Sequence, residues 1–252
     1  MAEPQADPAG AGHVLLPATQ WRTVPERIAD QILAAVAVGV LQPRQRLPSE
    51  RHLSTELGVS RTSVRLALSR LAANGVVESR RGRHGGTFVG DWEHSREAAE
   101  RVRRTLEPVR LEMEAMFDYR SLVEQLIART AARRHSRADV RAMRAALSAY
   151  RAAKTLGESR AADRALHSAV ADAARNEHLK RLSADLVSRA NLGFPNEPYR
   201  PELRWQAVQQ HADLVGAITA GDGELSARIA GDHFQVTTGD AWRSALGPSP
   251  RR

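Results

Sequence analysis

Four side chains in the C-terminal half of the chain have the types and spacing of a metal site. Asp163 and His167 are four residues apart, so in a helix they project from the same face, one turn apart. His211 and His233 each lie eleven residues from Asp222, which stands in a Gly-Asp-Gly turn. If the chain folds back at that turn into an antiparallel pair of helices, the two imidazoles lie at the same level along the helix axes.

Three imidazoles and one carboxylate form a donor set of borderline hardness. Such a set suits one divalent metal ion per chain, and Zn, Ni and Mn are all candidates. The chain has no cysteine, so a thiolate site is excluded. The alternative is that each histidine is an ordinary structural or surface residue, and the spacing alone leaves both interpretations open.

A second set of residues has the chemistry of nucleic-acid binding. Three polar side chains lie off the apolar face at the start of an expected helix, where a helix meets base edges: Arg61, Thr62 and Arg65. Arginine suits a bidentate contact with guanine, and neighbouring arginines can reach phosphates. The neighbours are Arg51, Arg81 and Arg83, with Gly82 between the last two and His84 as a further candidate contact. The alternative, a solvated basic face, fits an isolated arginine better than this co-located set.

The elements that must position these arginines are three helices and a hairpin within residues 21–90. Each expected helix has a capping residue before it and a glycine at or near its end. With their caps and stops, the helices span residues 23–39, 49–58 and 60–75. Two strand-like runs follow at 76–79 and 87–89, joined by a basic, glycine-rich loop. The pattern predicts a winged helix-turn-helix with a β-hairpin wing.

After residue 90 the sequence is helical throughout, which makes the fold mainly α. No strand-like alternation recurs, and prolines and glycines divide the region into segments. The expected helices span residues 94–106, 109–134, 137–154, 158–175, 177–192, 199–220 and 223–245. The high charge between residues 93 and 104 predicts a solvated linker helix at 91–107, followed by an all-helical bundle domain at 108–246.

Length and charge agree with this division. A chain of 252 residues exceeds the usual size of a single domain. Its formal net charge is +8, and residues 21–90 hold eleven arginines against five acidic residues. Because a basic surface attracts polyanions, the charge favours a nucleic-acid partner for the first domain.

The remaining composition concerns location and tails. No run approaches the ~18 uninterrupted apolar residues of a membrane span, and the absence of cysteine fits a reducing cytoplasm. Residues 1–20 contain no lysine or arginine, unlike a signal peptide. We expect residues 1–20 and 247–252 to be mobile tails, and the protein to be cytoplasmic.

The run LQPRQRLPSERHLSTELGVSRTSVRLALSRLAANGVVESRRGRHGGTFV resembles the DNA-binding domain of the GntR family. The resemblance covers about seventy residues. It implies that the positions contacting DNA are Arg51, Arg61, Thr62, Arg65, Arg81, Gly82 and Arg83. Two departures are visible: Arg44 stands where the family usually has glycine, and Leu66 where an acidic residue is common. The first puts the local turn in doubt, and the second a surface contact.

The second half resembles the FCD effector domain of the FadR branch of that family. The resemblance rests on Tyr119–Glu124, an Ala-rich helix and then, in order, Asp163, His167, Asn176, His211 and His233. In metal-binding members an Asp and three His hold one divalent ion, and a small carboxylate effector completes the coordination. The resemblance therefore implies that Asp163, His167, His211 and His233 are metal ligands, and it places Arg120 and Asn176 where effector cavities are often lined. Arg120 would pair with the effector carboxylate, and an intra-bundle ion pair is an equally good alternative.

These resemblances predict a homodimeric transcription regulator, not an enzyme, that reads a two-fold symmetric DNA operator. Repression relieved by a metabolite is the commoner mode in relatives, and we expect a small organic acid as the effector here. An acyl-CoA effector without a metal is the main alternative. A metal-dependent hydrolase would need a general base, and no HExxH-type motif is present. A protein that coats DNA by charge alone would bind all sequences equally.

Overall fold

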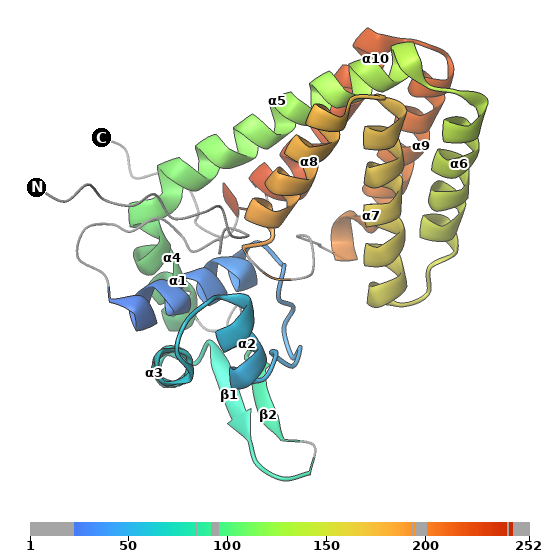
Figure 1. Ribbon diagram of the computed structural model, residues 1–252. Coiled ribbons are helices and arrows are strands. Elements are labelled where there is room, and N and C mark those ends of the chain that lie inside the picture. The colour runs from blue at the N-terminus through green and yellow to red at the C-terminus, as the bar shows by residue number, and fades with distance from the viewer. Residues whose placement is uncertain are drawn as a thin grey trace, which may run out of the picture.

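The computed structural model describes residues 23–83, 85–91, 96–192, 194, 201–240 and 242–243. The predicted tails at 1–20 and 247–252 and the predicted contact at His84 lie outside these residues. Within them the chain forms a head domain, residues 23–91, and a helical bundle, residues 110–234, joined by one helix (Figure 1). The predicted fold class, a winged helix-turn-helix followed by an all-helical domain, is confirmed.

The head contains three helices and one hairpin. The helices are α1 (Val24–Ala37), α2 (Glu50–Glu56) and α3 (Arg61–Ala73), and the strands are β1 (Val77–Arg80) and β2 (Gly86–Val89). The expected caps are present: the Ser49 hydroxyl accepts from the backbone N–H of His52 at 3.2 Å, and the Ser60 hydroxyl from that of Ser63 at 3.1 Å. Each cap satisfies an N–H group that the helix itself leaves unpaired.

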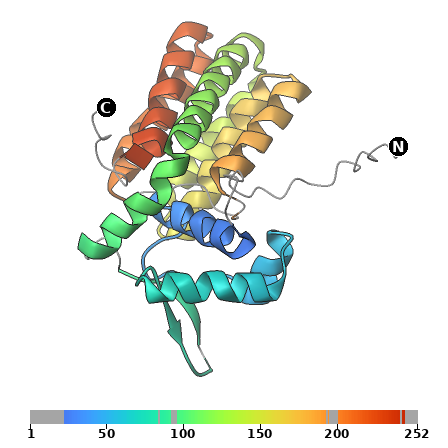
Figure 2. The same ribbon diagram turned by 90° about the vertical axis from the view of Figure 1, so that its left-hand side faces the viewer.

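Packing of α1 against α3 fixes the direction of α3. Ile28 and Ile32 of α1 are fully buried, and Val64 and Leu68 of α3 face the same core. The antiparallel hairpin pairs Val77 with Val89 at its base. It projects away from the bundle, and α1 lies between α3 and the bundle (Figures 1 and 2).

Arg44 shows how the chain accommodates its departure from the GntR pattern. Its backbone has φ +64°, a left-handed conformation that glycine adopts without strain. Two contacts hold the residue there: its N–H donates to the carbonyl of Val89 at 2.9 Å, and its guanidinium pairs with Asp91 at 3.0 Å. The turn expected of glycine is therefore kept by an arginine.

The helix α4 (Arg96–Leu106) connects the two parts, and a 3-10 turn (Glu107–Val109) leads into the bundle. The prediction that this linker is solvated is wrong for one of its faces. Val102 and Leu106 are fully buried and belong to the same apolar cluster as the core of the head. That cluster continues into the base of the bundle through Met113, Phe117 and Trp242.

In the part of the chain that the structure describes, six helices form the bundle. They are α5 (Arg110–Arg134), α6 (Arg137–Ala152), α7 (Leu156–Ala173), α8 (Glu177–Ala190), α9 (Arg204–Thr219) and α10 (Gly223–Phe234). The long α5 packs against α10 along much of its length (Figure 1). The expected helix over 223–245 is shorter in the structure, because α10 ends at Phe234 and a π-helical segment (Gln235–Asp240) follows. Among the described residues, no helix combines the length and the apolar character needed to cross a membrane.

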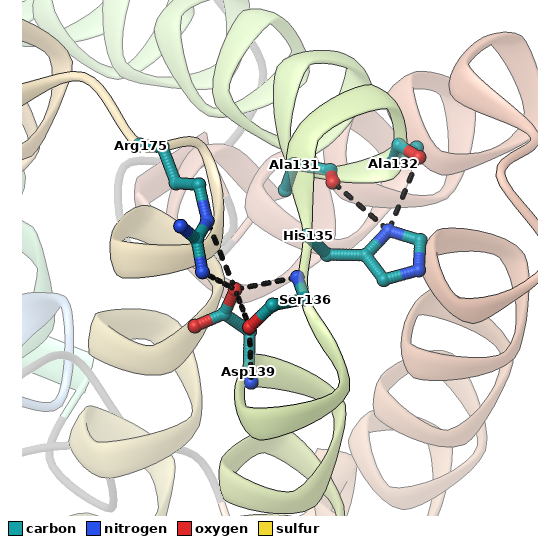
Figure 3. A network of polar contacts seen from close by, with 6 residues as sticks. All are labelled: Ala131, Ala132, His135, Ser136, Asp139 and Arg175. Atoms are coloured by element: carbon teal, nitrogen blue, oxygen red, sulfur yellow. Dashed lines mark hydrogen bonds and ion pairs between the residues drawn. The ribbon is translucent and has the colours of Figure 1, made fainter.

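A polar network holds the corner between α5 and α6 (Figure 3). One carboxylate oxygen of Asp139 accepts from the N–H of Ser136 at 2.7 Å and from its hydroxyl at 2.8 Å. The guanidinium of Arg175, in the loop between α7 and α8, donates to the same oxygen at 3.0 Å. The ring of His135 lies against the last carbonyls of α5. Asp139 therefore caps α6 and ties it to the neighbouring helix pair.

Replacing Asp139 with alanine should lower the free energy of unfolding by about 1–2 kcal/mol, the usual cost of a lost cap and a charged hydrogen bond. The Ser136 N–H, and secondarily Arg175, hold the pKa of this carboxyl below its ordinary value. The stabilisation is therefore present above the pKa of the unfolded chain, about 3.9, and is lost as pH falls through the folded pKa. Urea unfolding at pH 7 and pH 3 measures both effects, with Asp185→Ala on exposed α8 as control. Equal losses in the two variants would contradict the capping role.

Candidate metal centre and nucleic-acid interface

The four predicted ligands converge from three helices. Asp163 and His167 come from α7, His211 from α9 and His233 from α10. The Nε2 atoms of His211 and His233 are 3.2 Å apart, so the expected pairing across the turn at Asp222 is present. Nε2 of His211 lies 3.4 Å from Asp163 Oδ1, and Nε2 of His167 lies 3.7 Å from Asp163 Oδ2.

These separations fit a single divalent ion. The ligand atoms of the three histidines all lie within 4.8 Å of one another. Bonds of about 2.0–2.1 Å to one ion would place adjacent ligand atoms about 2.8–3.0 Å apart in octahedral geometry and about 3.3–3.4 Å apart in tetrahedral geometry. Two separations, 3.2 and 3.4 Å, are close to the tetrahedral value, and a third, 3.7 Å, is slightly longer. The side chains present therefore fit the group that the donor set implies.

Burial keeps the three imidazoles in the form that binds metal. Desolvation lowers the pKa of His211 to about 4. The pKa values of His167 and His233 are also well below the ordinary value, first because of burial and then because of the neighbouring His211 and Arg120. All three rings are therefore neutral at pH 7, as metal ligation requires.

Gln210 orients one of these rings. Its Oε1 atom lies 3.1 Å from Nδ1 of His233. If Nδ1 carries the proton, it donates to that oxygen and the lone pair of Nε2 points into the cluster. The sequence interpretation missed Gln210 and also Tyr150, whose ring packs edge-on to His211 at 4.8 Å between centroids. The only sequence signal for Gln210 is its position next to a ligand histidine.

Arg120 lies beside the cluster, as the resemblance implies. It projects from α5, is 1% exposed, and its Cζ atom lies 4.6 Å from the centroid of the Phe234 ring. Phe234 follows His233 directly, and its ring lies 4.9 Å from that of His167. A buried guanidinium at this place offers a cation to an anion bound among the histidines.

Asn176 has a different position. It is the N-cap of α8, and its Oδ1 atom accepts from the N–H groups of His178 at 3.0 Å and Leu179 at 3.2 Å. No hydrogen bond or ion pair given for the described residues joins Asn176 to the four ligands. The structure therefore gives this side chain a capping role at the start of a helix.

The predicted nucleic-acid contacts gather at the outer end of the head. Arg61, Thr62 and Arg65 are exposed at the N-terminal end of α3, and Arg51 is exposed on α2. The Arg65 guanidinium donates to Glu50 at 3.0 Å, a residue that the sequence interpretation did not single out. The bridging carboxylate holds Arg65 near the N-terminal end of α3.

The wing carries the remaining predicted contacts. Arg81, Gly82 and Arg83 are exposed at its tip. Gly82 has φ +108°, a conformation that other residues rarely adopt. A Cβ atom on Gly85 would lie 2.5 Å from the backbone oxygen of Arg80. The tight turn therefore requires glycine at these places. The hairpin lies on the same side of the molecule as α3 (Figure 2).

Comparisons with known proteins decide the family. Residues 25–89 match the description "Bacterial regulatory proteins, gntR family", and residues 115–236 match the FCD domain. The chain belongs to the GntR family. It is 30% identical to the putative L-lactate dehydrogenase operon regulatory protein of Escherichia coli (strain K12), over 86% of each chain. It is 34% identical to the HTH-type transcriptional regulator LutR of Bacillus subtilis (strain 168), over 73% of this chain and 86% of LutR.

The solved structure of E. coli McbR/YncC is 18% identical to this chain, with a TM-score of 0.45, over 89% of this chain and 99% of that one. The family and its relatives make this GntR-family protein a DNA-binding transcriptional regulator and not an enzyme. The alternative of a metal-dependent hydrolase is therefore set aside.

Proposed function

We propose that this regulator is a homodimeric repressor whose binding to a two-fold symmetric operator is controlled by a small organic acid at a metal centre. The observation that carries the proposal is the convergence of one carboxylate and three buried, neutral imidazoles from α7, α9 and α10. Asp163, His167, His211 and His233 would hold one divalent ion, with Zn, Ni and Mn as candidates. The ion would supply a Lewis-acidic position for a carboxylate group.

The charge around the centre favours an acid as the effector. Arg120 places a buried positive charge beside His167 and His233, where it can pair with a carboxylate bound at the ion. One relative is named for an L-lactate dehydrogenase operon, which makes L-lactate the first acid to test. The alternative, an acyl-CoA effector without a metal, gives the four converging side chains no ion to bind.

Replacing Arg120 with methionine should remove the response to the acid while leaving the metal in place. A lost charge-assisted hydrogen bond in a buried site costs about 1.5–3 kcal/mol, so the affinity for L-lactate should fall about tenfold or more. Binding is measured by calorimetry on metal-loaded protein, and operator release on duplexes selected from a random pool by the wild-type protein. Arg120→Lys keeps the charge and should retain part of the response. If L-lactate and related small hydroxy acids leave DNA binding by the wild-type protein unchanged, the acid-controlled function is wrong.

An apolar stripe on α5 supports the proposed homodimer. Leu111, Tyr119, Leu122 and Leu126 are 64, 42, 56 and 46% exposed. At 100° per residue their positions fall within about 80° of the helix circumference, on one face. A self-complementary face of this kind suits a two-fold axis, where the same patch meets itself. A second copy of this chain is therefore the expected occupant, and pairing would set two heads at a fixed spacing.

Placing glutamate at Leu122 and Leu126 should convert the dimer to a monomer, because paired stripes would bury four like charges. The mass in solution, measured by light scattering after gel filtration, should fall to half. Leu156→Glu is the control, since Leu156 is 37% exposed at the start of α7 and lies outside the stripe. A doubly substituted protein that keeps the wild-type mass would place the dimer interface elsewhere.

A further inference from the structure

The helix α7 carries a third functional position beside its two candidate ligands. Arg160, Asp163 and His167 are spaced by three and four residues, so they lie on one face of the helix. Asp163 and His167 belong to the metal centre, whereas Arg160 lies about one turn closer to the head. One rigid helix therefore joins the metal centre to whatever Arg160 contacts.

Arg160 contacts the backbone of the head. Its Nη2 atom donates to the carbonyl of Gly39 at 2.9 Å and to that of Val40 at 3.0 Å, and the residue is 5% exposed. Both carbonyls follow the end of α1 at Ala37. These carbonyls belong to the segment that directly follows the C-cap of α1, Val38. A guanidinium from the bundle thus holds the segment at the end of α1, across about 120 residues of sequence.

The helix that precedes these two carbonyls, α1, is the one that supports α3. All residues of α1 from Ile28 to Ala37 are buried, and in two views α1 lies between α3 and the bundle (Figures 1 and 2). Another hydrogen bond holds α1 from the segment just after α8, where the side chain of Gln31 donates to the carbonyl of Leu192 at 2.6 Å. A shift of α7 therefore moves α1, and α3 moves with it because the two share one core.

We propose that Arg160 is a positioning residue that couples occupancy of the metal centre to the placement of α3, through its hydrogen bonds to Gly39 and Val40. The inference rests on the proposed function. It identifies the contacts through which binding at the metal centre would reach the head of the same chain. Ligation at Asp163 and His167 favours one placement of α7, and Arg160 passes that preference to the end of α1. Coupling of this kind requires two arrangements that the ligand binds with different affinity.

The chain offers a matched control in Arg204. Its Nη2 atom donates to the carbonyls of Tyr150 and Ala153 at 3.0 Å each, at the end of α6. Arg204 stands seven residues before His211, as Arg160 stands seven residues before His167. Both arginines donate to two backbone carbonyls at or just after the end of a helix, but Arg204 does so within the bundle. Substituting each in turn separates coupling to the head from the loss of an arginine–carbonyl contact.

The experiment compares full-length wild type, Arg160→Met, Arg160→Lys and Arg204→Met, each stripped of metal and then titrated with Zn²⁺, with Ni²⁺ and Mn²⁺ in parallel. Hydrogen exchange is followed in two segments, 35–42 in the head and 160–170 in α7. In wild type the ion should change the hydrogen-exchange rate of both segments by about fivefold or more. Fivefold is the lower end of the usual coupling between two sites. In Arg160→Met the α7 response should remain and the head response should fall below about twofold. Arg204→Met should behave as wild type, and Arg160→Lys, which keeps a charged donor, should keep part of the head response.

The outcomes separate two failures. A head response that persists in Arg160→Met, with metal still bound, overturns the role of Arg160 and leaves the metal centre standing. A wild-type protein in which no ion changes exchange at α7 overturns the proposed metal centre and the coupling together. Equal loss of the head response in Arg160→Met and Arg204→Met shows that the loss of any such arginine–carbonyl contact has this effect, and overturns the specific route. Circular dichroism and metal content confirm that each variant is folded and loaded.

Discussion

Replacing His211 and His233 together with alanine should reduce the metal content of the purified protein from about one ion per chain to none. The two side chains come from different helices and meet at 3.2 Å between their Nε2 atoms, so their removal leaves only Asp163 and His167 of the four ligands. Two donors from one helix do not make a closed site for a divalent ion. Elemental analysis of protein purified without chelators measures the change directly.

The same variant should lose metal-dependent stability but stay folded. A ligand at a thousand times its dissociation constant stabilises the folded state by about 4 kcal/mol, so Zn²⁺ should raise the melting temperature of wild type by several degrees. The double variant should show no such rise. Its helices should form, because both imidazoles are already neutral and their loss leaves a cavity rather than an unpaired charge. His52→Ala with His178→Ala removes two exposed histidines as the control. Full metal occupancy in the double alanine variant would place the ligands elsewhere.

Replacing Arg65 with alanine should weaken operator binding by about 1–3 kcal/mol and relax base preference at one position in each half-site. Arg65 is exposed on α3, and Glu50 holds its guanidinium at 3.0 Å. A bidentate contact with guanine would account for a loss confined to one base pair. Titrations on operator duplexes with each base at that position, at two salt concentrations, distinguish base reading from phosphate contact.

Arg70 provides the control for Arg65. It lies on the same helix, is exposed, and pairs with a glutamate of the head, with 2.9 Å between its Nη1 atom and Glu26. It stands at the opposite end of α3 from Arg61, so Arg70→Ala should leave base preference unchanged. An Arg65→Ala protein with the affinity and preferences of wild type would remove Arg65 from the set of reading residues.

The parts of the site that the sequence predicted are those set by local spacing. Asp163 and His167 meet because four residues make one helical turn, and His211 meets His233 because the turn at Asp222 divides the segment evenly. Ser49 and Ser60 cap their helices because a short hydroxyl side chain satisfies nearby N–H groups. In each case the interaction lies within one helix or one helix pair.

The parts that the sequence did not predict depend on contacts between distant segments. Arg160 meets Gly39, and Gln31 meets Leu192, only because the bundle packs on the head. Neither Arg160 nor Gln31 stands in a recognisable sequence pattern. Charge predicted a solvated α4, but two apolar residues in it, Val102 and Leu106, decided its packing. The resemblance placed Asn176 at the effector cavity, and the structure adds a contact that the sequence did not predict, the N-cap of α8.

The apolar cluster shared by the head, α4 and the base of the bundle bears on how the protein unfolds. Because Ile32, Leu106 and Phe117 are buried in one continuous cluster, separating the head from the bundle would bring apolar surface into water at roughly 25 cal/mol per Å². The two parts should therefore melt in a single cooperative transition rather than in two steps. A truncated protein that ends near residue 91 would expose an apolar surface and tend to aggregate. Any change in the angle of the head must come from sliding along this contact, and small displacements at the operator-binding end are what such a joint permits.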